Sequence, residues 1–110
     1  MREIKESDWK IFRQLRELAL ERFCQRVLEE SDRLRSDAGQ SAYQRYIAIY
    51  QLFRERDKEL AEIFDNPRRS MALLNLGAIK VRGLLTEEEF ARFSEETQNS
   101  IAVLLGESPV

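Results

Sequence analysis

The residues with the clearest potential for chemistry form one row on the sequence between Tyr43 and Phe64. The row contains Tyr43, Tyr46, Tyr50, Phe53, Leu60 and Phe64, at alternating intervals of three and four residues apart from one gap. This spacing places side chains along one side of an α-helix. Asp57 fills the gap between Phe53 and Leu60. The row, with Asp57 included, is called the aromatic seam below.

Asp57 supports a structural and a binding interpretation. As a structural residue, it would accept hydrogen bonds from Arg16 or Arg22 of the preceding helix and set the register of a helical hairpin. As a binding residue, its carboxylate would hold a cation or an amine among aromatic ring faces. The residues of this candidate ligand site are Asp57, Tyr46, Tyr50 and Phe53. The structural interpretation is favoured, because single polar residues in helical seams commonly set register.

A candidate anion site follows the proline at position 67. Its residues are Arg68, Arg69 and Ser70. Proline is typical of the first turn of a helix, where free backbone N–H groups and the helix dipole favour negative charge. Two arginines are unfavourable there, because their positive charge opposes the helix dipole. A bound phosphate or carboxylate would offset that charge. Ion pairs with Glu62 or Asp65 would do the same without a ligand, and this second interpretation is favoured.

Acidic pairs raise the possibility of a divalent metal ion. The pairs Glu3/Glu6 and Glu29/Asp32 resemble, in their order, the E-x-x-E and E-x-x-D ligands of nucleotide pyrophosphatases of the MazG type. The resemblance implies an all-α carboxylate–metal enzyme that acts on a nucleotide or phosphate compound. In one continuous helix, however, the pairs would lie about 35 Å apart, too far to share an ion. We therefore expect a solvated, salt-bridged acidic surface and keep the enzyme as the alternative.

The composition argues against several other classes of function. The 110 residues include no His, which removes the commonest general base, Ser-His and Cys-His nucleophiles and most zinc sites. The lone Cys24 and the absence of an apolar leader in the first residues indicate a reduced, cytoplasmic setting. A net charge of −2 provides no general attraction for DNA or an anionic membrane. We expect no cofactor, no metal, no DNA and no membrane partner.

Helical periodicity covers almost the whole chain and predicts an all-α fold in one domain, residues 1–110. Helices are expected over about residues 8–36, 42–64, 67–82 and 87–105, the first with Ser7 or Asp8 as its cap. Ser41 and Thr86 begin capping boxes that start the second and fourth helices. Gly83 is expected to end the third helix.

Short connections then predict the architecture. Because only residues 37–40 join the first two helices, these should run antiparallel, with the aromatic seam against the apolar stripe of the first helix. In the third helix, the expected inner row is Met71, Leu74, Ala78 and Val81. The predicted fold is an irregular four-helix bundle, built from a long antiparallel helical hairpin and a shorter second hairpin.

The function predicted from these features is that of a binding protein. A protruding hairpin would expose apolar surface on the first helix, including Trp9, and we expect a homodimer through it. An arginine-bearing side of the same helix, with Arg22, Arg26 and Arg33, could contact RNA or an acidic partner. The favoured function is a small cytoplasmic protein–protein interaction or regulatory module, non-enzymatic, with a protein partner. The alternative is the carboxylate–metal enzyme.

Overall fold

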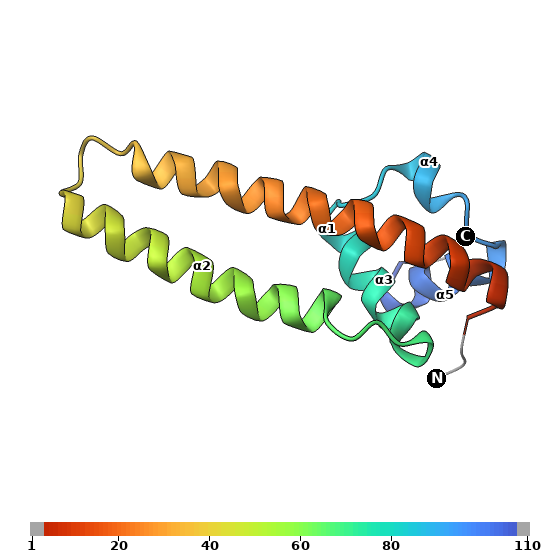
Figure 1. Ribbon diagram of the computed structural model, residues 1–110. Helices are drawn as coiled ribbons and strands as arrows, with labels where there is room; N and C mark the ends of the chain where they lie inside the picture. The colour runs from red at the N-terminus through yellow and green to blue at the C-terminus, as the bar shows by residue number, and fades with distance from the viewer. Residues whose placement is uncertain (1–3, 108–110) are drawn as a thin grey trace.

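A long helical hairpin carries a smaller group of helices at one end (Figure 1). The computed structural model describes residues 4–107, and no strand occurs among them. The helices are α1 (Glu6–Arg35), α2 (Ala42–Phe64), the 3₁₀ helix η1 (Arg69–Met71), α3 (Ala72–Val81), α4 (Glu87–Phe90) and α5 (Glu95–Leu104). The all-α class and the antiparallel pairing of α1 with α2 are confirmed.

The two ends of the hairpin differ in what surrounds them. Helix α3 packs against α1, α2 and α5, so these elements form a lobe around the first half of α1 and the end of α2. The other end of the hairpin, residues 24–53, extends away from the lobe and is called the distal hairpin. It accounts for the elongated shape, with extents of 51 × 30 × 21 Å. The predicted protruding hairpin is therefore present.

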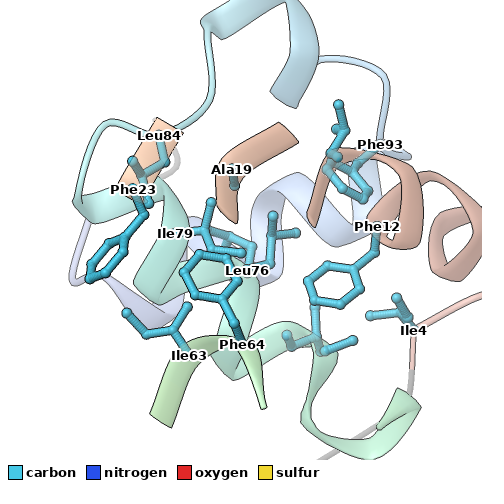
Figure 2. Close-up of a cluster of buried hydrophobic side chains, with 14 residues drawn as sticks. Ile4, Phe12, Ala19, Phe23, Ile63, Phe64, Leu76, Ile79, Leu84 and Phe93 are labelled. Atoms are coloured by element: carbon cyan, nitrogen blue, oxygen red, sulfur yellow. The ribbon is translucent and has the colours of Figure 1, made fainter. Parts of the chain in front are cut away.

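The hydrophobic core lies in the lobe (Figure 2). Helix α1 contributes Phe12, Leu15, Ala19 and Phe23, which follow the predicted helical spacing. The Phe23 and Phe64 rings meet edge to face, with centroids 5.8 Å apart. Burying each large side chain contributes about 1.5–3 kcal/mol. In the distal hairpin, which the structure describes in full, Leu52 is the only buried side chain.

Most helix ends that were predicted from residues close together in the sequence are confirmed. Ser41 with Gln44 and Thr86 with Glu89 form the two capping boxes. Gly83 has a φ of 66° and follows the last turn of α3. Its N–H donates to the Lys80 carbonyl (2.9 Å) and the next N–H, of Leu84, donates to Ile79 (3.2 Å). This pair of bonds is a Schellman motif, which satisfies carbonyls at a helix C-terminus.

The boundaries predicted for the last two helices are wrong in two places. The helix expected over residues 87–105 is broken: α4 ends at Phe90, and Ser94 caps a new helix, α5. The Ser-Glu-Glu sequence at residues 94–96 is itself a helix-start signal. The helix expected from residue 67 begins later, because Asn66 adopts a φ of 49° and η1 precedes α3.

The inner row predicted for α3 is also wrong. Met71, Leu74 and Val81 are exposed, whereas the buried apolar side chains are Ala72, Leu73, Leu76 and Ile79, and Asn75 is buried with them. Helix α3 is apolar on nearly all sides, so periodicity could not select the inner face. Packing against α1, α2 and α5 selected it instead.

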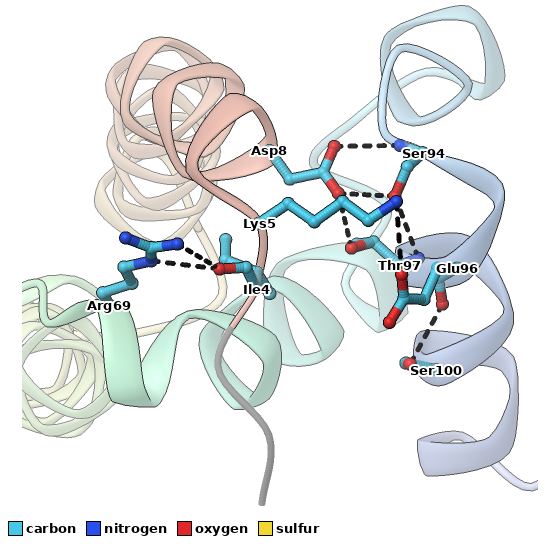
Figure 3. Close-up of polar contacts among 8 residues, drawn as sticks. All are labelled: Ile4, Lys5, Asp8, Arg69, Ser94, Glu96, Thr97 and Ser100. Carbon is cyan, nitrogen blue, oxygen red and sulfur yellow. Dashed lines mark hydrogen bonds and ion pairs between the residues drawn. The ribbon is translucent and has the colours of Figure 1, made fainter.

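A buried carboxylate joins the start of α1 to the start of α5 (Figure 3). Asp8 is 1% exposed and does not cap α1, whose N-cap is Lys5, without a side-chain hydrogen bond. Instead, Asp8 accepts hydrogen bonds from Ser94 N–H (2.9 Å), the Ser94 hydroxyl (2.6 Å) and the Thr97 hydroxyl (2.7 Å). Burial raises the pKa of Asp8, but these hydrogen bonds and nearby Lys5 outweigh it, so the pKa lies below 3.8.

Arginine side chains bind backbone carbonyls where segments end. Arg16 donates to Phe64, Arg22 to Leu84, Arg26 to Arg82 and Gly83, Arg45 to Arg35, and Arg69 to Ile4. A helix leaves its last carbonyls without intrahelical donors, and a guanidinium can supply several. Two arginines of the surface considered for RNA contact, Arg22 and Arg26, are therefore engaged within the chain.

Arg22 also forms the strongest ion pair with the second capping box. Its two terminal nitrogens lie 2.6 and 2.9 Å from the Glu89 carboxylate. The hydrogen bonds from Arg22 and from the Thr86 backbone N–H lower the pKa of Glu89 from 4.5 to about 2. The same carboxylate thus holds both the start of α4 and the middle of α1.

Replacing Asp8 with Ala should destabilise the protein by about 2–3 kcal/mol. The change leaves three donors around a buried site without their acceptor. Urea unfolding monitored by circular dichroism measures the effect. Asp32→Ala, an exposed acid on the same helix, is the control and should change the free energy of unfolding by less than about 0.5 kcal/mol. Equal effects of the two substitutions would contradict the role of Asp8.

Glu89→Gln should reduce stability at neutral pH by about 1–2 kcal/mol, through loss of charge-assisted hydrogen bonds. Because the folded-state pKa of Glu89 is depressed, its contribution is present above pH 4.5 and disappears as the pH falls toward about 2. The stability difference between the unmodified protein and the variant should therefore shrink over this range. Urea unfolding at several pH values measures it, with exposed Glu88→Gln as control. A pH-independent difference would contradict this linkage.

Candidate functional site

Most of the aromatic seam does not pack against α1, so this part of the prediction is wrong except at its lobe end, where the Phe64 ring meets Phe23 of α1. Its aromatic residues on the distal hairpin face solvent: Tyr43 is 73% exposed, Tyr46 66%, Tyr50 56% and Phe53 41%. Only the lobe end of the seam is covered, with Leu60 partly buried and Phe64 fully buried. The exposed portion forms one continuous row by helical spacing.

A different side of α2 faces α1. It includes Ile49, Leu52, Arg56 and Ile63, of which Leu52 and Ile63 are buried. These positions again recur at intervals of three, four and seven residues, which defines a helix side rotated away from the tyrosines. Tyrosine hydroxyls need a hydrogen-bond partner when buried, and the aliphatic side of α2 requires none. This difference favours the observed orientation.

A pocket of about 190 Å³ borders the exposed aromatic row, between α1 and α2. It is lined by Phe23, Cys24, Val27, Leu28, Phe53, Arg56, Asp57 and Leu60. Leu28 is 54% exposed and extends the apolar surface from α2 onto α1. Tyr43, Tyr46, Tyr50, Phe53 and Leu28 are together called the aromatic face. This face and the adjoining pocket are the candidate functional site.

Two of the four predicted ligand residues meet at this pocket. Phe53 and Asp57 line it, whereas Tyr46 and Tyr50 lie farther along the same side of α2 and do not. The structure thus places the carboxylate beside one aromatic ring, with the other two rings on the open surface. An enclosed aromatic cage around a cation is not formed by these four residues.

Asp57 does not have the register-setting contact predicted for it. Arg16 binds the Phe64 carbonyl and Arg22 binds Glu89, so neither reaches Asp57. The Asp57 side chain is exposed and forms no hydrogen bond or ion pair with any of the described residues. The aspartate therefore borders an apolar pocket without a partner of its own.

Arg56 occupies the position that links the helices. Its guanidinium lies 3.4 Å from Glu30 of α1 and 3.0 Å from Glu59. Arg82, at the end of α3, also contacts Glu59 at 3.4 Å. These four charged residues form a continuous layer across α1, α2 and α3. They line a second pocket, of about 240 Å³, which Arg26 also lines, so three arginines face two glutamates there.

The predicted anion-binding residues do not converge. The Arg69 guanidinium binds the Ile4 carbonyl (2.8 and 3.0 Å; Figure 3). It also pairs with Glu6 (2.8 Å), rather than with Glu62 or Asp65. Arg68 and Ser70 are exposed. The Ile4 carbonyl and the Glu6 carboxylate therefore offset the positive charge of Arg69. The same contacts join the segment before α1 to η1.

The predicted acidic pairs are also separate. Glu3 lies outside the described residues, and Glu6 pairs with Arg69 in the lobe. Glu29 and Asp32 lie exposed on the distal hairpin. Among residues 4–107, no three His, Cys, Asp or Glu side chains are grouped closely enough to hold a metal ion. Nor is any helix in this range both long and apolar enough to span a membrane.

No family model, curated protein or solved structure matches this chain. The candidate site is therefore defined by its own chemistry. Two of its features were absent from the sequence prediction: the contribution of Leu28 and the role of Arg56. Leu28 belongs to the apolar row Leu20, Cys24 and Leu28, which the sequence places beside the main apolar stripe of α1, but the row alone does not show that Leu28 joins the aromatic residues of α2. The role of Arg56 depends on Glu30 and Arg82, which are distant in sequence.

Arg56→Ala should destabilise the protein by about 1 kcal/mol, because it removes partly exposed ion pairs and leaves Glu30 without its partner. Asp57→Asn, at the next position, should change the free energy of unfolding by less than about 0.5 kcal/mol. Urea unfolding of both variants provides a matched comparison. A larger effect of Asp57→Asn than of Arg56→Ala would restore the register role to Asp57.

Proposed function

We propose that this protein is a small cytoplasmic interaction module, non-enzymatic, whose distal hairpin binds a protein partner through the aromatic face. The observation that carries this proposal is the exposure of Tyr43, Tyr46, Tyr50 and Phe53 in one row on a well-formed helix. Tyrosine and phenylalanine are enriched in protein interfaces, where they bury large areas at a low cost in side-chain entropy.

The clustering of these side chains distinguishes the aromatic face from ordinary surface exposure. Single exposed apolar residues are common on folded proteins, whereas contiguous apolar patches mark interaction sites. Here, four exposed large apolar residues follow one another on α2, and Leu28 of α1 continues the patch beside the pocket. A partner can therefore contact both helices of the hairpin at once.

The position of the aromatic face on the hairpin supports the same proposal. The distal hairpin has one fully buried side chain, Leu52, so it has little core of its own. A two-helix segment with so little core gains stability when a partner covers its apolar side. The row at intervals of three and four residues is also the pattern by which helices bind helices.

A photo-crosslinking experiment in cells tests this proposal. A benzophenone amino acid at position 46 places the reactive group on the aromatic face, and at position 55 on the opposite side of α2, because nine residues correspond to about two and a half turns. Tyr46 and Glu55 are both exposed, so neither replacement should disturb folding. We expect a crosslinked protein adduct, identified by mass spectrometry, from position 46 and not from position 55.

Two results would contradict the proposal. One is the absence of any protein adduct from position 46 although the protein is folded and present in the cell. The other is an equal yield of the same adducts from positions 46 and 55, which would indicate random collision. Far-ultraviolet circular dichroism of the purified variants checks that both keep their helices.

A further inference from the structure

We infer that the occupant of the aromatic face is a second copy of this chain, bound antiparallel through α2. This inference rests on the proposed function, because it names the partner of the same surface. It follows from the order of residues in the aromatic seam and from the unpaired Asp57 beside the pocket. Together these features make the surface complementary to itself.

When the α2 helices of two copies run in opposite directions, the seam residues of one copy pair with those of the other in successive layers. Placing Tyr50 of one copy opposite Phe53 of the second fixes the register of all other positions. Tyr46 then lies opposite Asp57, and Tyr43 lies opposite Leu60, each of the second copy. A two-fold axis repeats every layer, so each seam residue between Tyr43 and Leu60 faces another seam residue. This is the arrangement required of an isologous interface.

The layer that pairs Tyr46 with Asp57 of the second copy favours this register and the antiparallel direction. Asp57 forms no hydrogen bond or ion pair with the residues that the structure describes, and Tyr46 carries an exposed hydroxyl. A phenol hydroxyl that donates to a carboxylate forms a short, charge-assisted hydrogen bond. Parallel helices would instead bring the two Asp57 carboxylates together, where like charges repel. An antiparallel register shifted by one heptad toward Phe53 would bury Asp57 against carbon atoms, at a high desolvation cost.

The pocket supplies the matching shape. Phe53, Asp57 and Leu60 line it from α2, and Leu28 lines it from α1. In the inferred register Leu60 and Asp57 face Tyr43 and Tyr46 of the second copy, and Phe53 faces Tyr50, so a tyrosine ring of each chain enters the pocket of the other. Side chains that insert between helices in this way are the usual packing of helical bundles. The two hairpins would then share a four-helix core that the distal hairpin lacks alone.

A charge exchange at two positions tests the inferred register. Tyr46→Glu places a carboxylate opposite Asp57 of the second copy and should weaken self-association at least about tenfold. Adding Asp57→Lys to the same chain places Lys opposite Glu in both symmetric layers and should recover most of that loss. Within one chain the two positions lie about 16 Å apart along the helix, so the recovery must occur between chains.

Sedimentation equilibrium of the purified full chain over micromolar concentrations measures these effects. Val103→Glu is the matched control, because it places the same charge on an exposed apolar residue of α5, outside the seam. This control should dimerise like the unmodified protein. Circular dichroism confirms that each variant is folded, as expected for exposed positions.

The outcomes separate this inference from the proposed function. A dimer that is weakened by Tyr46→Glu, restored by adding Asp57→Lys and unaffected by Val103→Glu supports the inference. A monomer at all concentrations overturns it, while an adduct of a different protein from position 46 would still support the proposed function. A dimer that is insensitive to Tyr46→Glu, or not restored by the second change, also overturns the inference.

Discussion

The donation of hydrogen bonds from arginine side chains to backbone carbonyls is the interaction on which the arrangement of the lobe depends. Short elements such as η1 and α4 have little apolar surface, and their placement relies on contacts with helix α1. Arg22 and Arg26 of α1 bind the carbonyls around Gly83, and Arg69 binds that of Ile4. Each guanidinium satisfies carbonyls that water or a cap would otherwise have to satisfy. The result is a lobe assembled around α1.

Holding the lobe at one end of α1 has a consequence for the hairpin. The core residues of α1 end at Phe23, and beyond that point α1 and α2 meet through Leu52, the Arg56 layer and partly buried aliphatic side chains. Stability is therefore concentrated in the lobe. The distal hairpin is free to carry an apolar surface that serves binding, and the aromatic face is where such a surface occurs.

The sequence identified the row of aromatic residues on α2 but not which side of the helix is buried. The aromatic seam and the outlying Asp57 were identified from spacing alone, and both are at the site. Their orientation was wrong, because an apolar row predicts that a helix side will be covered and does not say by what. The charged residue of α2 that forms an ion pair with α1 is Arg56 rather than Asp57. Local spacing could not single out Arg56, because its partner Glu30 lies 26 residues earlier in the sequence. Arg82, which shares Glu59 with Arg56, lies at the end of α3.

By itself, the sequence determined the all-α class, the antiparallel hairpin, the two capping boxes and the stop at Gly83. These features depend on residues within a few positions of one another, so local hydrogen bonding and backbone conformation decide them. Only the tertiary structure decided which side of α2 and of α3 is buried, and that Asp8 binds the N-cap residue of α5 from 86 residues away. These features depend on how well whole surfaces pack together, and those surfaces meet only after folding. The exposure of the aromatic face is one such choice, and it turns a predicted core stripe into a candidate binding surface.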